Sequence, residues 1–158
     1  MKELIKVDHL CVRLKTTKKL LVRDVNFSIA SGESLIILGQ SGCGKTMTCH
    51  AIMGLLDPRR FEVTGSLTFK NRNLLSLSRK EKQKLYGGLI AMIPQNPMTA
   101  FDPSVRIGKQ MKETLRLHSG LSGSNLVVKI KEALEKAGLD EPDRVYRSHP
   151  HTLSGGML

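Results

Sequence analysis

The sequence predicts an α/β fold in which an antiparallel β part precedes a helical part. Three observations lead to this class. The N-terminal third alternates apolar and polar residues, two compact apolar runs each lead into a glycine-rich or turn-rich segment, and apolar residues recur at helical spacing after residue 104. We therefore expect a mixed α/β part over residues 1–94 and a helical part over residues 95–158.

The N-terminal third contains two expected strands. Residues 5–14 (IKVDHLCVRL) alternate Ile5, Val7, His9 and Cys11 against polar neighbours, and residues 20–29 (LLVRDVNFSI) alternate in the same way. Residues 34–38 (SLIIL) form a compact apolar run, which is typical of a parallel strand buried on both faces. From Lys45 the apolar residues fall at helical spacing, and we expect this helix to end before Pro58.

The remaining elements follow from the same patterns. Period two returns over residues 61–69, and Ser78 to Glu81 (SRKE) form a capping box at the start of a short basic helix. Residues 89–93 (LIAMI) are expected to be a second buried strand that leads into Gln95. Two further helices are expected, one with Ile107, Met111 and Leu115 on one face, and one with Val127, Ile130, Leu134 and Ala137 that ends at Gly138.

The composition is that of an ordinary globular domain. The 158 residues are 40% hydrophobic and 25% charged. No apolar run approaches the ~20 residues that a membrane-spanning helix needs, and the start MKELIKVDHL lacks the apolar stretch of a secretory signal. Cys11, Cys43 and Cys49 are too scattered for a disulfide framework or a zinc site. We expect a cytoplasmic protein with reduced thiols.

The formal net charge of +11 raises the possibility of an anionic partner, either nucleic acid or a membrane surface. The basic residues are dispersed along the sequence, aromatic residues make up only 4%, and there is no Trp to stack on bases. Nucleic acid is therefore disfavoured as a partner. A phosphate-binding domain that has lost an acidic C-terminal part would show the same imbalance.

Residues 39–46 (GQSGCGKT) fit the pattern G-x-x-x-x-G-K-[ST] between an expected strand and an expected helix. Glycines let successive backbone N–H groups converge on phosphate oxygens, and the helix N-terminus adds its dipole. The predicted phosphate-binding residues are Gly39, Gln40, Ser41, Gly42, Cys43, Gly44, Lys45 and Thr46. Lys45 supplies a charge for the β- and γ-phosphates and Thr46 a hydroxyl for Mg²⁺, so ATP and Mg²⁺ are the expected ligands. A ligand-free glycine-rich turn would leave Lys45 unexplained.

Cys43 lies inside this loop, where a lowered thiol pKa would make it reactive; a small filler residue is the favoured interpretation. His149 and His151 flank Pro150, and without a third nearby ligand we interpret them as a hinge segment and not as a metal site.

Three motifs in order, GQSGCGKT, then Gln95 within MIPQNPMTAFDP, then LSGGM, resemble the ATP-binding-cassette (ABC) ATPases. The phrases PQNPMTAFDP and HPHTLSGGML resemble the branch that powers the uptake of dipeptides, oligopeptides and nickel, with nickel import as the nearest likeness. The resemblance implies an incomplete P-loop nucleotide-binding domain with a helical subdomain. It also implies a motor subunit at the cytoplasmic face of the membrane that has no direct contact with cargo.

The resemblance assigns roles to residues of the second half. Gln95 would contact Mg²⁺ and the attacking water, and the segment 95–103 would contact the membrane subunits. Ser154, Gly155 and Gly156 would present a helix N-terminus to the γ-phosphate held by a second ATPase subunit, in a homodimer or a heterodimer.

Two features depart from the family pattern. The segment VRLKTTKK has no aromatic residue to stack on adenine, and no Walker B strand ending in Asp-Glu follows Gly156. We therefore expect a truncated ATPase that binds nucleotide weakly, does not turn it over, and exposes apolar sheet edges. Two alternatives stay open: an ATPase of the same fold that acts on nucleic acid, and a non-catalytic fragment that docks on a partner.

Overall fold

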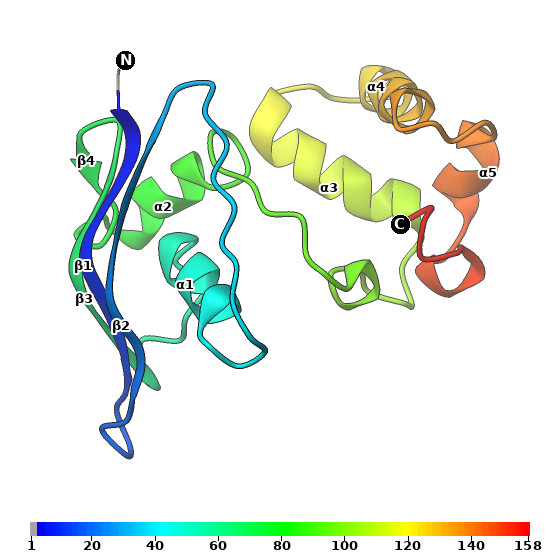
Figure 1. Cartoon of the computed structure of the whole chain (residues 1–158). Coiled ribbons are helices and arrows are strands. Elements are labelled where there is room, and N and C mark those ends of the chain that lie inside the picture. Colours follow the sequence, from blue (N-terminus) through cyan, green and yellow to red (C-terminus); the bar gives the residue numbers. More distant parts are fainter. Residues whose placement is uncertain (1–2) are drawn as a thin grey trace. The chain divides into compact units, whose positions relative to one another are not determined.

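The computed structural model describes residues 3–158 (Figure 1). The chain divides into two compact units, the first ending at Ala91 and the second comprising Met92–Leu158. We describe each unit by itself.

The first unit is built on a four-stranded antiparallel sheet with the order β2-β1-β3-β4. The strands are β1 (Glu3–Leu14), β2 (Leu20–Ala30), β3 (Phe61–Phe69) and the short β4 (Arg72–Asn73). Strand β1 is central, and its Val7 lies opposite Phe27 of β2 and Leu67 of β3. The two long strands expected from alternation in the N-terminal third, and the strand over residues 61–69, are confirmed.

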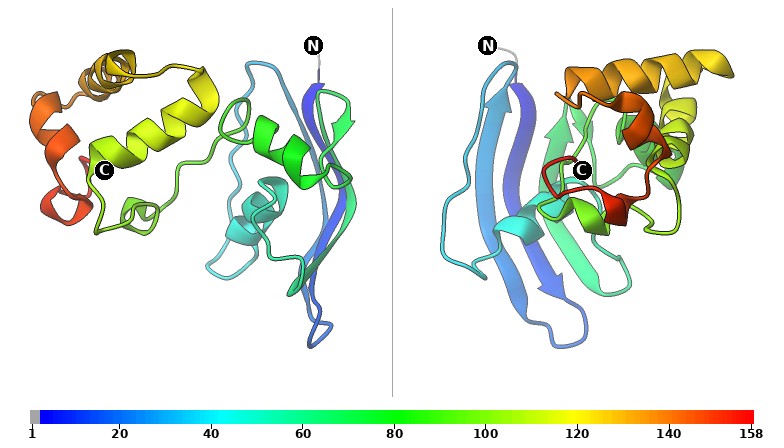
Figure 2. Two further views of the ribbon diagram at one scale, coloured as in Figure 1. Left: turned by 180° about the vertical axis from the view of Figure 1, so that it is seen from behind. Right: turned by 90° about the vertical axis from the view of Figure 1, so that its right-hand side faces the viewer.

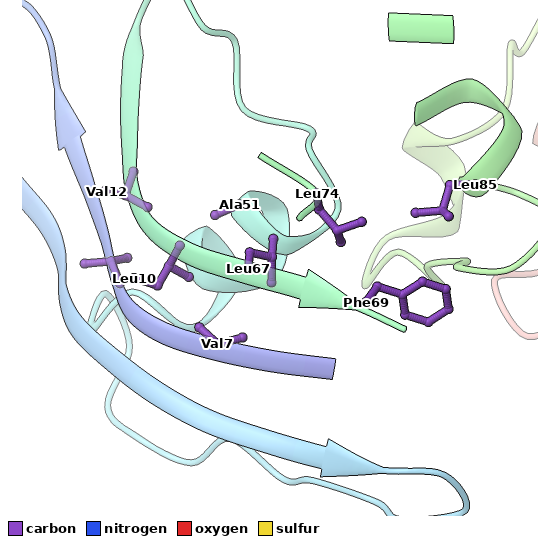
Figure 3. Packing of buried hydrophobic residues seen from close by; sticks show 9 residues of the cluster. Val7, Leu10, Val12, Ala51, Leu67, Phe69, Leu74 and Leu85 are labelled. Carbon is purple, nitrogen blue, oxygen red and sulfur yellow. The ribbon is translucent and has the colours of Figure 1, made fainter. Parts of the chain in front are cut away.

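Two helices cover one face of this sheet: α1 (Lys45–Ile52) and α2 (Arg79–Leu85) (Figures 1 and 2). The expected capping box is confirmed at α2, where Ser78 accepts from the Glu81 backbone and the Glu81 carboxylate accepts from Ser78. Ala51 of α1 and Leu85 of α2 pack on the sheet within one buried cluster (Figure 3). The other buried members of this cluster are Val7, Leu10, Val12, Val22, Leu67, Phe69 and Leu74.

The alternation expected along β1 is interrupted at His9. The structure buries Val7, Leu10 and Val12, and the pairing registers of β1 shift between Val7 and Leu10. His9 has a φ of 50°, and its backbone N–H donates to the Asn26 side chain, at 2.7 Å. This bulge shifts the alternation of buried and exposed residues by one position. Cys11 therefore does not continue the buried face of Val7 as expected.

Gly65 on β3 makes room for the bulge. Its φ is +104°, and a Cβ there would lie 2.4 Å from the carbonyl oxygen of His9. Only a residue without a Cβ fits at this close approach between β3 and β1.

The two expected buried strands are not formed, and this prediction was wrong. In residues 34–38 the side chains of Ile36 and Leu38 are 78% and 85% exposed, and in residues 89–93 the side chain of Ile93 is 96% exposed. No strand of the described chain pairs with either segment beyond a single bridge from Tyr86 to Ile90. An apolar run forms a buried strand only where neighbours satisfy its backbone groups and cover its faces, and the sheet in this unit is entirely antiparallel.

The second unit is helical. It contains η1 (Pro97–Thr99), α3 (Ile107–Ser119), α4 (Ser124–Lys136), α5 (Pro142–Arg147) and η2 (Pro150–Thr152). The two long helices expected from apolar spacing are confirmed as α3 and α4. The buried cluster of this unit consists of Ile107, Ile130, Leu134, Val145 and Leu153.

Helix α4 ends as its sequence predicts. Gly138 has a φ of +82°, its N–H donates to the carbonyl of Glu135, and the N–H of Leu139 donates to the carbonyl of Leu134. These two bonds define the Schellman motif expected at this glycine. Across residues 3–158, no helix has the length and apolar character that crossing a bilayer would require.

Candidate nucleotide-binding site

The glycine-rich loop leads into α1, which begins at Lys45. Gly42 and Gly44 have φ values of +81° and +103°, in the region that favours glycine. A Cβ on Gly44 would lie 3.2 Å from the carbonyl oxygen of Leu21 and 3.3 Å from Cγ2 of Val22. A side chain at position 44 would therefore crowd β2 in addition to adopting a strained backbone conformation.

The exit of the loop is fixed by Thr48. Its backbone N–H and its hydroxyl both donate to the carbonyl oxygen of Gly44, at 2.8 and 3.0 Å. Thr48 is 4% exposed, and within the described chain it is the one residue with a polar side chain that is buried. The first turn of α1 is thus held firmly to the residue that precedes it.

The ammonium group of Lys45 lies at the centre of the loop. Its Nζ donates to the carbonyl oxygens of Gly39 and Gln40, at 2.7 and 2.8 Å, and lies 3.7 Å from Sγ of Cys43. The loop is therefore wrapped around its own lysine, and a phosphate would take over the ammonium from these two carbonyl oxygens.

The backbone of the loop also provides open donors. The N–H groups of Gly44, Lys45 and Thr46 make no hydrogen bond to protein oxygens in the described chain. They stand at the positive end of the α1 dipole, so together with the Lys45 ammonium they form a donor set suited to a phosphate chain. The residues therefore fit the tail of a nucleotide.

Thr46 is exposed on the first turn of α1, in a position where its hydroxyl can reach a cation held by phosphates. No group of three or more His, Cys, Asp or Glu residues in the described chain could hold a metal ion. A Mg²⁺ ion at this loop would be held by the phosphates and Thr46, since Mg²⁺ keeps several waters and takes few protein ligands.

Cys43 packs inside the loop. A Cβ on Gly39 would lie 2.7 Å from the Cys43 sulfur, so this sulfur occupies the space next to Gly39. The thiol is exposed on its other side. This geometry favours the interpretation of Cys43 as a filler residue.

Gln95 lies in the second unit, in an exposed bend. The expectation that a buried strand places it was wrong, because residues 89–93 form no strand. Its neighbour Asn96 shapes the loop instead, since the Asn96 side chain accepts from the N–H of Met98, at 3.2 Å, at the start of η1.

Sequence reasoning missed the residues that organise the rest of segment 95–103. The Gln110 side chain donates to the carbonyl oxygens of Asp102 and Val105 and accepts from the Asp102 N–H, at 3.0, 2.7 and 2.9 Å. Hydrogen bonds from the hydroxyl and N–H of Ser104 hold the pKa of Asp102 below its ordinary value. The signal in the sequence is Asp-Pro-Ser, which is typical of a turn closed by an aspartate.

A cavity of about 330 Å³ lies beside this loop. It is lined by Phe101 and Ala100 of the loop and by Gln110, Met111, Thr114 and Leu115 of α3. Phe101 is half-buried against the cluster of the second unit, and Met98 is 41% exposed. The loop therefore offers apolar surface at both residues.

The signature segment forms a turn and not a helix start. The N–H of Met157 donates to the carbonyl of Ser154, at 2.9 Å, and Ser154, Gly155 and Gly156 are exposed. Leu153 is 8% exposed and anchors the segment to the helical cluster. Among the described residues, the segment after Leu153 therefore forms a single turn over Ser154–Met157.

The two histidines before the signature segment stack on one another, with ring centroids 5.5 Å apart. Nδ1 of His151 lies 3.2 Å from the carbonyl oxygen of Pro103, so this histidine is tied to the loop that precedes α3.

The predicted site residues are divided between the two units. The phosphate loop belongs to the first unit, whereas Gln95 and the signature segment belong to the second.

A P-loop that opens α1, an antiparallel sheet and a helical subdomain define part of an ABC nucleotide-binding domain. The family model for ABC transporters matches residues 22–158, and the chain belongs to this family. The chain is similar to the dimeric structure of MJ0796, a bacterial ABC transporter cassette, with a TM-score of 0.80 and 25% identity. That match covers 97% of this chain and 64% of that one.

Curated relatives are similar to the chain at a higher sequence identity. The chain is 42% identical to the metal-staphylopine import system ATP-binding protein CntD of Staphylococcus aureus, over 98% of this chain and 57% of that protein. It is 41% identical to the dipeptide transport ATP-binding protein DppD of Bacillus subtilis, over 86% and 41% of the two chains. It is 38% identical to the oligopeptide transport ATP-binding protein OppD of the same organism, over 98% and 44%. The chain spans about half the length of these relatives.

Proposed function

We propose that the chain contributes the phosphate loop and the signature segment to the ATP-binding subunit of an ABC importer. The observation that carries this proposal is the set of donors around Lys45, where the ammonium and the open N–H groups of the α1 N-terminus converge. This donor set has no structural task other than contacts within its own loop, and it suits the triphosphate of Mg-ATP.

The cargo would be a short peptide or a metal such as nickel. Relatives named for metal-staphylopine, dipeptide and oligopeptide import support this class and do not choose within it. The motor subunit would work at the cytoplasmic face of the membrane and would not touch the cargo itself.

The second unit would supply contacts for partners. Gln95 would meet Mg²⁺ and the attacking water, and segment 95–103, with exposed Met98, would contact the membrane subunits. Ser154, Gly155 and Gly156 are exposed, with open space where a Cβ would stand on either glycine, and this suits a close approach to a nucleotide held by a second ATPase subunit.

The 158 residues by themselves would bind Mg-ATP weakly and would not turn it over. Binding must displace the Lys45 ammonium from two carbonyl oxygens, and residues 34–38, which lead into the loop, have no strand partner to hold them. On its entry side the loop is therefore held by the Lys45 ammonium and not by a paired strand.

Calorimetric titration of this chain with Mg-ATP tests the proposal. Lys45→Ala should weaken binding by about tenfold or more, since a charge-assisted contact to phosphate is lost. The matched control Lys136→Ala removes an exposed lysine from the last turn of α4 and should leave the affinity unchanged. Equal affinities for the two variants would defeat the proposal.

Phosphate release provides a separate measurement. We expect no turnover above background for the 158-residue chain with Mg-ATP. Robust hydrolysis that depends on Lys45 would contradict this part of the proposal while leaving nucleotide binding intact.

A further inference from the structure

Positive charge gathers between the end of β3 and the end of α2, although the sequence as a whole suggests dispersed charge. Six cations lie within residues 70–84, beside one acidic residue, Glu81. The six, which we call the basic face, are Lys70, Arg72, Arg79, Lys80, Lys82 and Lys84. Within the described part of the chain, none of them forms an ion pair.

The turn and the helix that carry these cations belong to one packed region of the first unit. Leu85 of α2 lies in the same buried cluster as Leu74 and Phe69 (Figure 3). Hydrogen bonds from Ser78 hold the pKa of Glu81 below its ordinary value, and the charges of Arg72 and Lys84 add to this to a smaller extent. Arg72 on β4 is therefore close enough to α2 for its charge to act on the Glu81 carboxylate.

The single carboxylate does not neutralise the basic face. Both the N–H and the hydroxyl of Ser78 donate to Oε2 of Glu81, at 2.8 and 2.6 Å, so this group is engaged in capping α2. The local excess of positive charge therefore remains available to an external partner.

Helix stability does not explain the arrangement. Arg79 and Lys80 occupy the first turn of α2, where the helix dipole disfavours cations. Leu85 points into the core, helical spacing turns Arg79 and Lys80 away from it, and the neighbouring Lys84 is also exposed. Arg79 and Lys80 therefore face solvent at some cost to the helix, whereas Lys84, in the last turn, is favoured by the dipole.

We propose that the basic face binds the anionic headgroups of a lipid membrane. Exposed lysines and arginines without ion-pair partners are attracted to an anionic bilayer, each adding to the affinity; five of the six cations are exposed, and Lys82 is half-buried. Leu89, whose N–H donates to the carbonyl of Leu85 at the end of α2, is 62% exposed and supplies an apolar side chain close to that end of the helix. The choice of a membrane rests in part on the proposed importer function.

Nucleic acid fits the basic face less well. Recognition of single strands relies on exposed aromatic side chains, but Phe69 is 4% exposed and the hydroxyl of Tyr86 donates to the carbonyl of Ile52, at 3.1 Å. Neither ring is free to stack on a base.

Flotation of the chain with lipid vesicles tests the inference. Wild-type protein should float with vesicles that contain phosphatidylglycerol, should not float with phosphatidylcholine vesicles, and should dissociate as salt is raised. The triple variant Arg79→Gln, Lys80→Gln, Lys84→Gln should bind anionic vesicles roughly tenfold more weakly or worse. Circular dichroism should show nearly the same helix content as wild type, because the loss of Arg79 and Lys80 from the unfavourable first turn of α2 offsets the loss of Lys84 from its favourable last turn.

A second triple variant, Lys109→Gln, Arg116→Gln, Lys136→Gln, removes the same charge from exposed positions in the second unit and should retain vesicle binding. Equal losses in the two triple variants would show a general effect of net charge and would overturn the inference. Tighter binding to duplex DNA than to anionic vesicles, lost with the α2 substitutions, would also overturn it.

The vesicle assay and the nucleotide assay test the two proposals separately. Lys45→Ala should float with anionic vesicles as wild type does, since Lys45 is engaged by the carbonyl oxygens of Gly39 and Gln40 and is not part of the basic face. Loss of nucleotide binding with retained flotation would count against the proposed function only.

Discussion

Gly44 allows a sharp test of how the phosphate loop is held, because the same substitution can be made at glycines that differ in one respect. Gly44, Gly42 and Gly32 have φ values of +103°, +81° and +84°. A Cβ at Gly44 would lie within 3.3 Å of the Leu21 carbonyl oxygen and of Val22, whereas a Cβ at Gly42 or Gly32 meets nothing within 4 Å. Alanine at each position therefore carries the conformational strain, and only Gly44→Ala adds crowding against β2.

The two contributions can be given magnitudes. A left-handed conformation costs an alanine about 1–2 kcal/mol, and the loss of chain entropy in the unfolded state offsets about 0.4–1 kcal/mol of this. Gly32→Ala should thus lower the free energy of unfolding by roughly 1 kcal/mol. Crowding against a packed strand adds about 1–3 kcal/mol at Gly44.

Thermal unfolding followed by circular dichroism measures the difference. In domains of roughly 60–100 residues, 1 kcal/mol corresponds to a shift of about 4–8 °C, so Gly44→Ala should melt several degrees below Gly32→Ala. Gly42→Ala should melt close to Gly32→Ala, because a Cβ at either position meets nothing within 4 Å. Equal melting temperatures for all three variants would refute the account of how the loop rests on β2.

Two further predictions concern the packing of each unit. Ile130→Ala should destabilise the helical unit by about 2–5 kcal/mol, because Ile130 is fully buried, whereas Val128→Ala, at a side chain 55% exposed, should change the denaturant midpoint little. Ser78→Ala should cost about 1 kcal/mol through the lost N-cap of α2. Hydrogen bonds from Ser78 lower the pKa of Glu81 from its ordinary 4.5, so this stabilisation is complete above pH 4.5 and is lost as the pH falls through the folded-state pKa. The Ser78→Ala penalty should therefore shrink in acid, and a penalty that grew below pH 4 would contradict the capping geometry.

Local patterns were sufficient to predict the elements whose causes are local. The Ser78–Glu81 capping box and the Schellman end at Gly138 involve residues three to five apart, and both form as predicted. Helices α3 and α4 follow from a periodicity that does not depend on distant strands.

The predictions that failed depend on distant neighbours. Residues 34–38 and 89–93 have the composition of buried strands, but a strand exists only through the strands beside it, and no strand of the described chain pairs with either segment. The bulge at His9 also depends on a partner across the sheet, and the single clue was Gly65, an isolated glycine within a predicted strand.

The phosphate loop joins these two kinds of element, and this explains the position of Lys45. Its exit belongs to a locally determined helix, fixed by the two bonds from Thr48 to Gly44 and by the burial of Ala51. Its entry follows a segment without strand partners, so the backbone at Gly39 is free to turn its carbonyl toward the ammonium. Lys45→Ala and Gly44→Ala therefore probe different halves of the loop: the first removes the charge that phosphate and carbonyl oxygens compete for, and the second disturbs the half that is already in place. A larger loss of Mg-ATP affinity for Lys45→Ala than for Gly44→Ala would show that this competition, and not the anchoring of α1, limits the affinity.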